Sequence, residues 1–98
     1  MTYCEQPVSD YREVVGTTGQ LVDVREPSEV ATGTLPGAIN IPLGQLPSRL
    51  AELDRSRRVV LLCRSGARSA NAAELLVGAG FTDVVNLVGG MLAAATSE

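Results

Sequence analysis

Short runs of aliphatic residues alternate along the whole chain with segments rich in glycine, proline and charged residues. The aliphatic runs have the length of β-strands and lie at 21–24, 38–41, 59–62 and 84–87. An apolar run without polar alternation predicts a strand that is buried on both faces, as in a parallel sheet. The run 59–62, which reads Val-Val-Leu-Leu, is the best example and predicts the central strand.

Helical segments are expected between the strands. A helix over 11–15 would end at Gly16, and a helix over 27–32 would begin with proline, which favours the first helical position. In the segment 46–53, leucines fall on one helical face and charged residues on the other. The segment 69–78 is rich in alanine and leucine and closes on glycine. Strands and helices alternating at this spacing predict an α/β fold, with a central, mostly parallel sheet of about four to five strands and helices on both faces.

The length and composition of the chain fit one globular domain over residues 1–98. Of its 98 residues, 45% are hydrophobic and 19% charged, which is sufficient for one core. No apolar run approaches the ~20 residues that cross a bilayer. The first residues also lack the basic and apolar regions of a secretory signal. We therefore expect a cytoplasmic protein with reduced thiols and no membrane contact.

Charge and missing residue types exclude several functions. The formal net charge is −3 and the arginines are scattered, which argues against binding to nucleic acids. The chain has no histidine, and all 8 basic residues are arginines, so imidazole general bases and lysine Schiff bases are excluded. With no histidine, 2 cysteines are too few for a four-ligand zinc site, so we expect no metal.

The cysteine that follows the predicted central strand is the candidate nucleophile. Active sites of parallel sheets lie beyond the carboxyl ends of the strands, where Cys63 stands in front of a loop and a helix. Loop amides, the helix dipole and two nearby arginines favour negative charge, so the pKa of the thiol should be lowered. A cysteine after an apolar run is more often a small buried hydrophobe, but the loop that follows favours a reactive thiol. Cys4 lacks such surroundings and is expected to be a bystander near a frayed terminus.

Four segments, in the right order, resemble the signatures of the rhodanese family, the sulfurtransferases that carry a persulfide on a loop cysteine. These segments are 21–29, 33–42, 63–69 and 80–91. The resemblance covers nearly the whole chain and implies a rhodanese-like domain. It also implies that Cys63 becomes the persulfide and that neither a metal nor an organic cofactor takes part.

The resemblance assigns roles to the residues around the cysteine. The loop would cradle the outer sulfur of the persulfide with Arg64, Ser65, Gly66, Ala67, Arg68 and Ser69. From their positions, Arg64 is expected at the mouth of the pocket, and Arg68 is expected to brace the loop, against Asp23. Asp23 and Arg25 match the family's Asp-Val-Arg and are expected near the loop, either as an ion pair that anchors it or in a role toward the substrate.

Other positions are expected to be structural. Glu29 is assigned to a solvated helix face. Gly89 and Gly90 are interpreted as turn residues without a further role. The chain departs from the family pattern at two places. Thr34 stands where the family often has histidine, and the chain stops soon after Met91, where the family usually continues with tryptophan. Residues 91–98 are therefore interpreted as a shortened C-terminal tail.

The implied function is transfer of a sulfane sulfur from a donor such as thiosulfate to a thiophilic acceptor, through a Cys63 persulfide and with ping-pong kinetics. The acceptor would be cyanide, a thiol or a protein thiol, and the domain would act as a monomer or weak dimer. Two alternatives stay open: a catalytically weak docking module of the rhodanese type, and a cysteine phosphatase or arsenate reductase. In cysteine phosphatases the loop is one residue longer than the stretch from Cys63 to Arg68, which disfavours a phosphate-sized pocket here.

Overall fold

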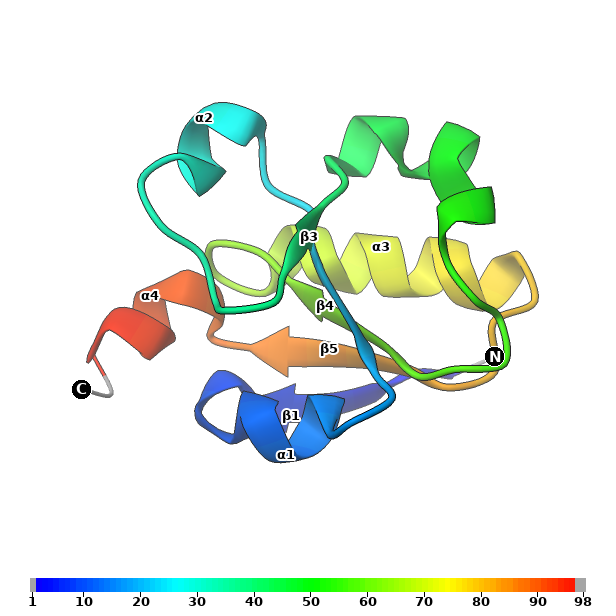
Figure 1. Ribbon diagram of the computed structural model, residues 1–98, viewed down its shortest axis with the longest axis horizontal. Coiled ribbons are helices and arrows are strands. Elements are labelled where there is room, and N and C mark those ends of the chain that lie inside the picture. Colours follow the sequence, from blue (N-terminus) through cyan, green and yellow to red (C-terminus); the bar gives the residue numbers. More distant parts are fainter. Residues whose placement is uncertain (1, 97–98) are drawn as a thin grey trace.

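Five parallel strands form one sheet at the centre of the structure (Figure 1). The computed structural model describes residues 2–96. The sheet has the order β1-β5-β4-β2-β3, with β1 (Cys4–Pro7), β2 (Gln20–Asp23), β3 (Ile39–Asn40), β4 (Val59–Leu62) and β5 (Val84–Val88). Each pair of neighbouring strands is parallel. The predicted α/β class and the predicted parallel sheet are confirmed.

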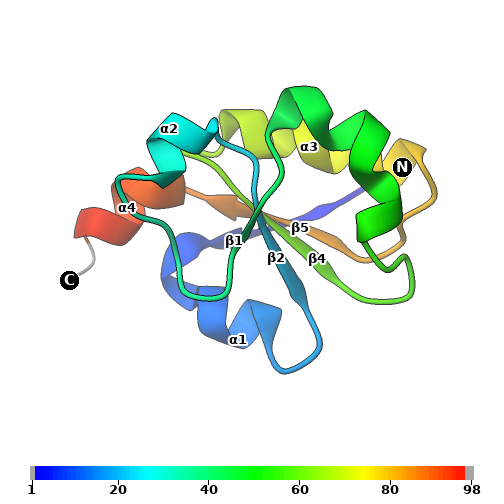
Figure 2. The same ribbon diagram turned by 45° about the horizontal axis from the view of Figure 1, so that its top comes forward.

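Helices cover both faces of the sheet, as Figure 2 shows. The helix α3 (Ala67–Gly78) and the 3-10 segment η2 (Leu43–Glu52) pack on one face. The 3-10 turn η1 (Val8–Asp10) and the helix α1 (Tyr11–Val15) pack on the other face. The helices α2 (Pro27–Val30) and α4 (Gly90–Thr96) lie toward the end of the molecule where the strands finish. Within residues 2–96, no helix has the length and apolar character needed to cross a membrane.

The strand β4 is buried on both faces, as its unbroken apolar run predicted. Val59 and Leu61 pack in the layer of α3 and η2, whereas Val60 and Leu62 pack in the layer of α1. All four side chains are 0% exposed. Burying side chains of this size contributes about 1.5–3 kcal/mol each, so the central strand ties the two layers together and fixes the position of the residue that follows it.

The strand β1 is the part of the sheet that the aliphatic pattern did not predict. Its residues are all exposed and carry no apolar run, yet they pair with β5, with Cys4 opposite Val85. The expectation that Cys4 lies near a frayed terminus is therefore wrong, because this residue opens a hydrogen-bonded edge strand. Backbone pairing holds the strand, and backbone pairing leaves no apolar signature in the sequence.

Three helical segments differ from their expected form. The helix α2 ends two residues earlier than expected, and α3 begins two residues earlier. The segment with leucines on one face is a pair of 3-10 turns with a kink at Arg49, and Pro47 removes a backbone donor inside it. Its apolar face is nevertheless in the core, where Leu46 and Leu53 are buried.

The segment interpreted as a shortened tail is largely an ordered helix. Helix α4 extends to Thr96, and Met91, Ala93 and Ala94 pack against the core on the α1 face. Residues 97 and 98 lie outside the described residues. The end of the described chain therefore belongs to the packed domain.

The chain leaves β2 and β4 in opposite directions across the sheet. The strand after β2 is β3 at one edge, and the strand after β4 is β5 on the other side. In open α/β sheets the crevice between two such strand ends binds ligands. Asp23 pairs in register with Leu62, so the residues that follow β2 and β4 meet at this crevice.

Candidate active site

Cys63 is the first residue after β4 and opens the loop to α3. Its side chain belongs to the α3 layer, and the residue is 1% exposed. The sulfur accepts a hydrogen bond from the Gly66 amide, with 3.0 Å between N and Sγ, and another from the Ser69 hydroxyl, with 3.3 Å between Oγ and Sγ. Gly66 has a φ of 108°, a left-handed conformation that favours glycine and turns the loop back toward the cysteine.

The donors around the sulfur favour its ionised form. Burial alone raises the pKa of the Cys63 thiol, but hydrogen bonds from the hydroxyl and amide of Ser69 and from the amides of Gly66 and Ser65 outweigh it, and the pKa is lowered. The direction agrees with the prediction from the sequence. The groups that bond to the sulfur are amides and a hydroxyl, and the two arginines of the loop are not among them.

Arg68 is bound by Glu29, which corrects two expectations from the sequence. Nη1 and Nη2 of Arg68 donate to the two carboxylate oxygens of Glu29, at 2.7 and 2.8 Å. This pairing lowers the pKa of the Glu29 carboxyl to about 2. Arg68 is therefore not paired with Asp23, and Glu29 is not part of a purely solvated face. The carboxylate also accepts a hydrogen bond from the Glu26 amide at the start of α2, so the pair ties α2 to the beginning of α3.

Asp23 and Arg25 form a buried ion pair with each other. Nη2 of Arg25 donates to Oδ2 of Asp23 at 2.7 Å, and the two side chains are 6% and 0% exposed. The same guanidinium nitrogen donates to the Gly33 carbonyl at 2.7 Å, and the Thr34 hydroxyl donates to Asp23 at 2.7 Å. The pair thus anchors the segment between α2 and β3. Thr34, where the family often has histidine, is one of the groups that satisfy the buried carboxylate.

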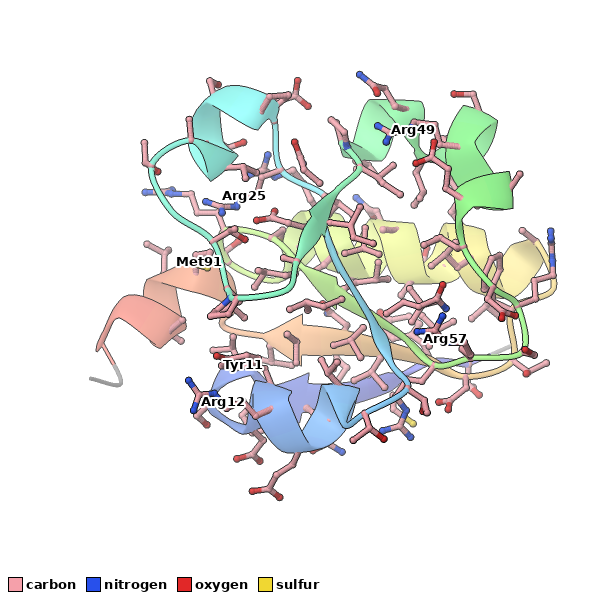
Figure 3. The ribbon with its side chains drawn as sticks, viewed as in Figure 1. Tyr11, Arg12, Arg25, Arg49, Arg57 and Met91 are labelled. Atoms are coloured by element: carbon pink, nitrogen blue, oxygen red, sulfur yellow. The ribbon has the colours of Figure 1, made fainter. Side chains whose placement is uncertain are left out.

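Arg64 lies on an open groove next to the loop. The groove has a volume of about 420 Å³. Its walls include residues of α2, α4 and the loop, among them Glu29, Met91 and Arg64. Figure 3 shows Arg25 and Met91 at this end of the molecule, where the strands finish. Arg64, Ser65 and Ala67 are exposed, whereas the sulfur lies beneath them.

The first residues of α4 bind the backbone of the same loop. The amides of Met91 and Leu92 donate to the carbonyls of Cys63 and Arg64, at 2.9 and 3.0 Å. Gly90 has a φ of 55°, and a Cβ placed on it would collide with the Cys63 carbonyl oxygen and with the backbone of Arg64. The expectation of turn geometry alone is therefore incomplete, since Gly90 also permits the close approach of α4 to the cysteine.

Asn86 is a residue near the cysteine that the reasoning from sequence did not single out. It lies in β5, is 2% exposed, and accepts a hydrogen bond from the hydroxyl of Ser69. A polar residue inside an otherwise aliphatic strand requires a buried hydrogen-bond partner, and this is the signal that the sequence did contain. Among residues 2–96, no cluster of histidine, cysteine, aspartate and glutamate side chains is arranged to hold a metal ion.

The sequence also matches a model of a known protein family. The family model of the rhodanese-like domain matches residues 7–96. The chain belongs to the rhodanese-like domain family.

Relatives of this rhodanese-like domain share its sequence and its fold. A sulfurtransferase of Allochromatium vinosum is 45% identical over 73 residues, which are 74% of this chain and 68% of that protein. The crystal structure of a rhodanese-related protein from Thermoplasma volcanium superposes with a TM-score of 0.87, at 30% identity, and covers 97% of this chain and 93% of the other. The human single-domain sulfurtransferase TSTD1 superposes with a TM-score of 0.84, at 26% identity, over 99% of both chains. The family of this chain therefore includes proteins named as sulfurtransferases.

Proposed function

We propose that this rhodanese-like domain transfers a sulfane sulfur from a donor such as thiosulfate to a thiol acceptor, through a persulfide on Cys63. The observation that carries the proposal is the setting of the sulfur at the end of the central strand. There it receives hydrogen bonds from the Gly66 amide and the Ser69 hydroxyl. A thiolate held by such donors is a nucleophile at neutral pH without a histidine base.

In the first step, the Cys63 thiolate attacks the outer sulfur of the donor. A bond forms between the two sulfur atoms, and the bond from the outer sulfur to the rest of the donor breaks. When the donor is thiosulfate, the electron pair of the broken sulfur–sulfur bond leaves with sulfite. The negative charge moves to the outer sulfur of the persulfide, and amides of the loop that point toward the sulfur stabilise it there.

In the second step, an acceptor thiolate or cyanide attacks the outer sulfur. The sulfur–sulfur bond to Cys63 breaks, its electron pair returns to Sγ, and the cysteine thiolate is regenerated. The two half-reactions share one enzyme form, so the kinetics are expected to be ping-pong. Both cysteines are free thiols, and a reducing compartment such as the cytoplasm would keep Cys63 ready for the next cycle.

Arg64 is assigned to donor binding because it is exposed at the groove beside the loop. Its guanidinium can contact the oxygens of an anionic donor as the donor approaches the buried sulfur. Arg68 is engaged by both carboxylate oxygens of Glu29, so its guanidinium is not free to hold a phosphoryl group. This pairing argues against the phosphatase and arsenate reductase alternative.

Mass spectrometry after treatment with thiosulfate tests the proposal. The expected result is a mass increase of one sulfur atom on Cys63, which disappears on addition of cyanide. The variant Cys63→Ser is expected to lose the adduct and the transfer of sulfur to cyanide, whereas Cys4→Ser should retain nearly all activity because Cys4 is exposed on the edge strand. A protein that takes up no sulfur at Cys63 would instead be a docking module, and equal loss in both variants would give Cys4 a role in transfer.

A further inference from the structure

The hydroxyl of Ser69 lies between two hydrogen-bond acceptors. It faces Sγ of Cys63 at 3.3 Å on one side and Oδ1 of Asn86 on the other. Ser69 is 0% exposed and Asn86 is 2% exposed, so water does not replace either partner. A hydroxyl carries one proton, and Ser69 can therefore donate to only one of the two acceptors at a time.

The orientation of the Asn86 amide is fixed from its other side. Its Nδ2 donates to the Gly66 carbonyl and to the Glu5 carboxylate, both at 3.2 Å. Both of these groups are acceptors, and a flipped amide would place Oδ1 against each of them. Oδ1 consequently stays directed at Ser69 and competes with the sulfur for its proton.

The strength of the sulfur as an acceptor changes during the proposed reaction cycle, on which this inference rests. In the free enzyme the negative charge lies on Sγ itself, which is then a strong acceptor. In the persulfide the charge lies on the outer sulfur, and Sγ is a neutral atom bonded to carbon and sulfur. Asn86 Oδ1 is the same neutral acceptor in both states.

We propose that Asn86 is a positioning residue that competes with Cys63 for the single proton of Ser69. The hydroxyl turns to Sγ in the free thiolate and turns back to Oδ1 of Asn86 once the sulfur is loaded. The movement is a rotation about the Cβ–Oγ bond, and no covalent bond is made or broken. Asn86 thereby stabilises the persulfide relative to the free thiolate, because it supplies a partner for Ser69 in the loaded state only.

The charged groups around this chain of hydrogen bonds are few. Glu5 on β1 lies behind Asn86, Arg64 follows the cysteine in the loop, and Arg68 lies on α3 in its pair with Glu29. The buried pair of Asp23 and Arg25 lies at the end of β2 and is neutral as a unit. The variants used below substitute none of these charged groups, although Asn86→Leu removes the hydrogen bond that the Glu5 carboxylate accepts.

A double-mutant cycle on the pKa of the Cys63 thiol tests the proposal. The pKa is measured from the pH dependence of alkylation by iodoacetamide in a Cys4→Ser background. Ser69→Ala is expected to raise it by about one unit, because a charge-assisted hydrogen bond to the thiolate is lost. Asn86→Leu is expected to lower it by about half a unit, because Ser69 is released to the sulfur. In the Ser69→Ala background, Asn86→Leu should cause no further shift.

A residue that only braces the loop gives the opposite result. Loss of its bond to the Gly66 carbonyl would disorder the amides around the sulfur, so Asn86→Leu would raise the pKa, and the shift would persist without Ser69. Either observation would overturn the proposal. Asn86→Ser serves as a second variant in case the leucine variant melts early. The hydroxyl introduced at position 86 can rotate and donate a proton of its own, so it does not require the proton of Ser69. Asn71→Leu, on the exposed side of α3, is the control and should leave the pKa unchanged.

The proposed function and this inference can fail independently. The thiol pKa is measured in the free enzyme and requires no sulfur donor. Uptake of sulfur from thiosulfate by the unchanged protein is scored separately by mass. Absence of that uptake would remove the proposed function, whereas a wrong sign in the cycle would remove only the role of Asn86.

Discussion

At the scale of single residues, the burial of Cys63 restricts the reagents that reach it. The residue is 1% exposed beneath an exposed loop, while Cys4 is exposed on β1. We expect a bulky maleimide to label Cys63 much more slowly than Cys4. Small iodoacetamide should label Cys63 with a pH inflection below about 8.5, the ordinary pKa of a cysteine thiol. Peptide mapping after timed labelling measures both rates, and an inflection at the ordinary pKa would show that the loop does not activate the sulfur.

The exposed arginine of the loop is expected to affect binding of the donor more than the fold. Arg64→Ala should raise the KM for thiosulfate about tenfold, because a charge-assisted contact is lost, with little change in melting temperature. Steady-state kinetics and thermal melts measure the two effects. Arg12→Ala provides a matched control, because Arg12 is an exposed arginine on α1 (Figure 3). A lower melting temperature with an unchanged KM would assign Arg64 to the fold instead.

The sequence was informative about the cysteine and its loop, but it did not show which side chains pair with them. Cys63 could be proposed as the candidate nucleophile because a strand, a cysteine and a helix start are consecutive in the chain. Glu29 could not be paired with Arg68 in the same way, since 39 residues separate them and the contact exists only after folding. The partner of Ser69 at Asn86 is likewise contributed by a different strand. Side chains that orient a site from other elements are therefore the part that sequence patterns leave out.

At the scale of elements, the ion pair that joins α2 to α3, formed by Glu29 and Arg68, is expected to weaken at acid pH. The pKa of Glu29 is about 2 in the folded protein and 4.5 in its ordinary state, so the pair stabilises the fold above about pH 4.5 and loses this contribution as the pH falls toward 2. In Glu29→Gln, the free energy of unfolding should change less between about pH 4.5 and pH 2 than in the unchanged protein. Urea unfolding at a series of pH values measures it. The same slope in Glu29→Gln as in the unchanged protein would show that other carboxylates cause the acid loss.

The buried pair at the end of β2 is expected to contribute more to stability than a surface pair. Arg25→Met leaves the Asp23 carboxylate buried, and among residues 2–96 the Thr34 hydroxyl and a backbone amide remain as its donors. The variant should cost about 3 kcal/mol of unfolding free energy. Arg49→Ala, which removes an exposed pair with Glu52, should cost about 0.5 kcal/mol or less. Chemical denaturation of both variants makes the comparison. Equal costs would mean that Asp23 is satisfied without its arginine.

At the scale of the whole molecule, burial explains which strands could be predicted. The strand β4 is enclosed on both faces, so its residues had to be aliphatic, and the run 59–62 identified it as central. The strand β1 lies at an edge with all residues exposed, so no such requirement acts on its side chains. The class of the fold followed from the alternation of strands and helices. The strand β1 is held at the edge by backbone pairing with β5 and by the hydrogen bond from Asn86 to Glu5, and neither produces an apolar run in the sequence.

The backbone hydrogen bonds between α4 and the cysteine loop have a consequence for synthesis on the ribosome. The chain is synthesised from its amino end, so β1 can pair with β5 only after β5 has emerged. In the same way, the carbonyls of Cys63 and Arg64 can accept their hydrogen bonds only after Met91 and Leu92 have emerged. Until those last residues emerge, the loop around the sulfur lacks two of its anchors. The loop around Cys63 therefore reaches its described arrangement only once α4 has been synthesised, and we expect the pKa of the Cys63 thiol in a chain without α4 to lie closer to its ordinary value.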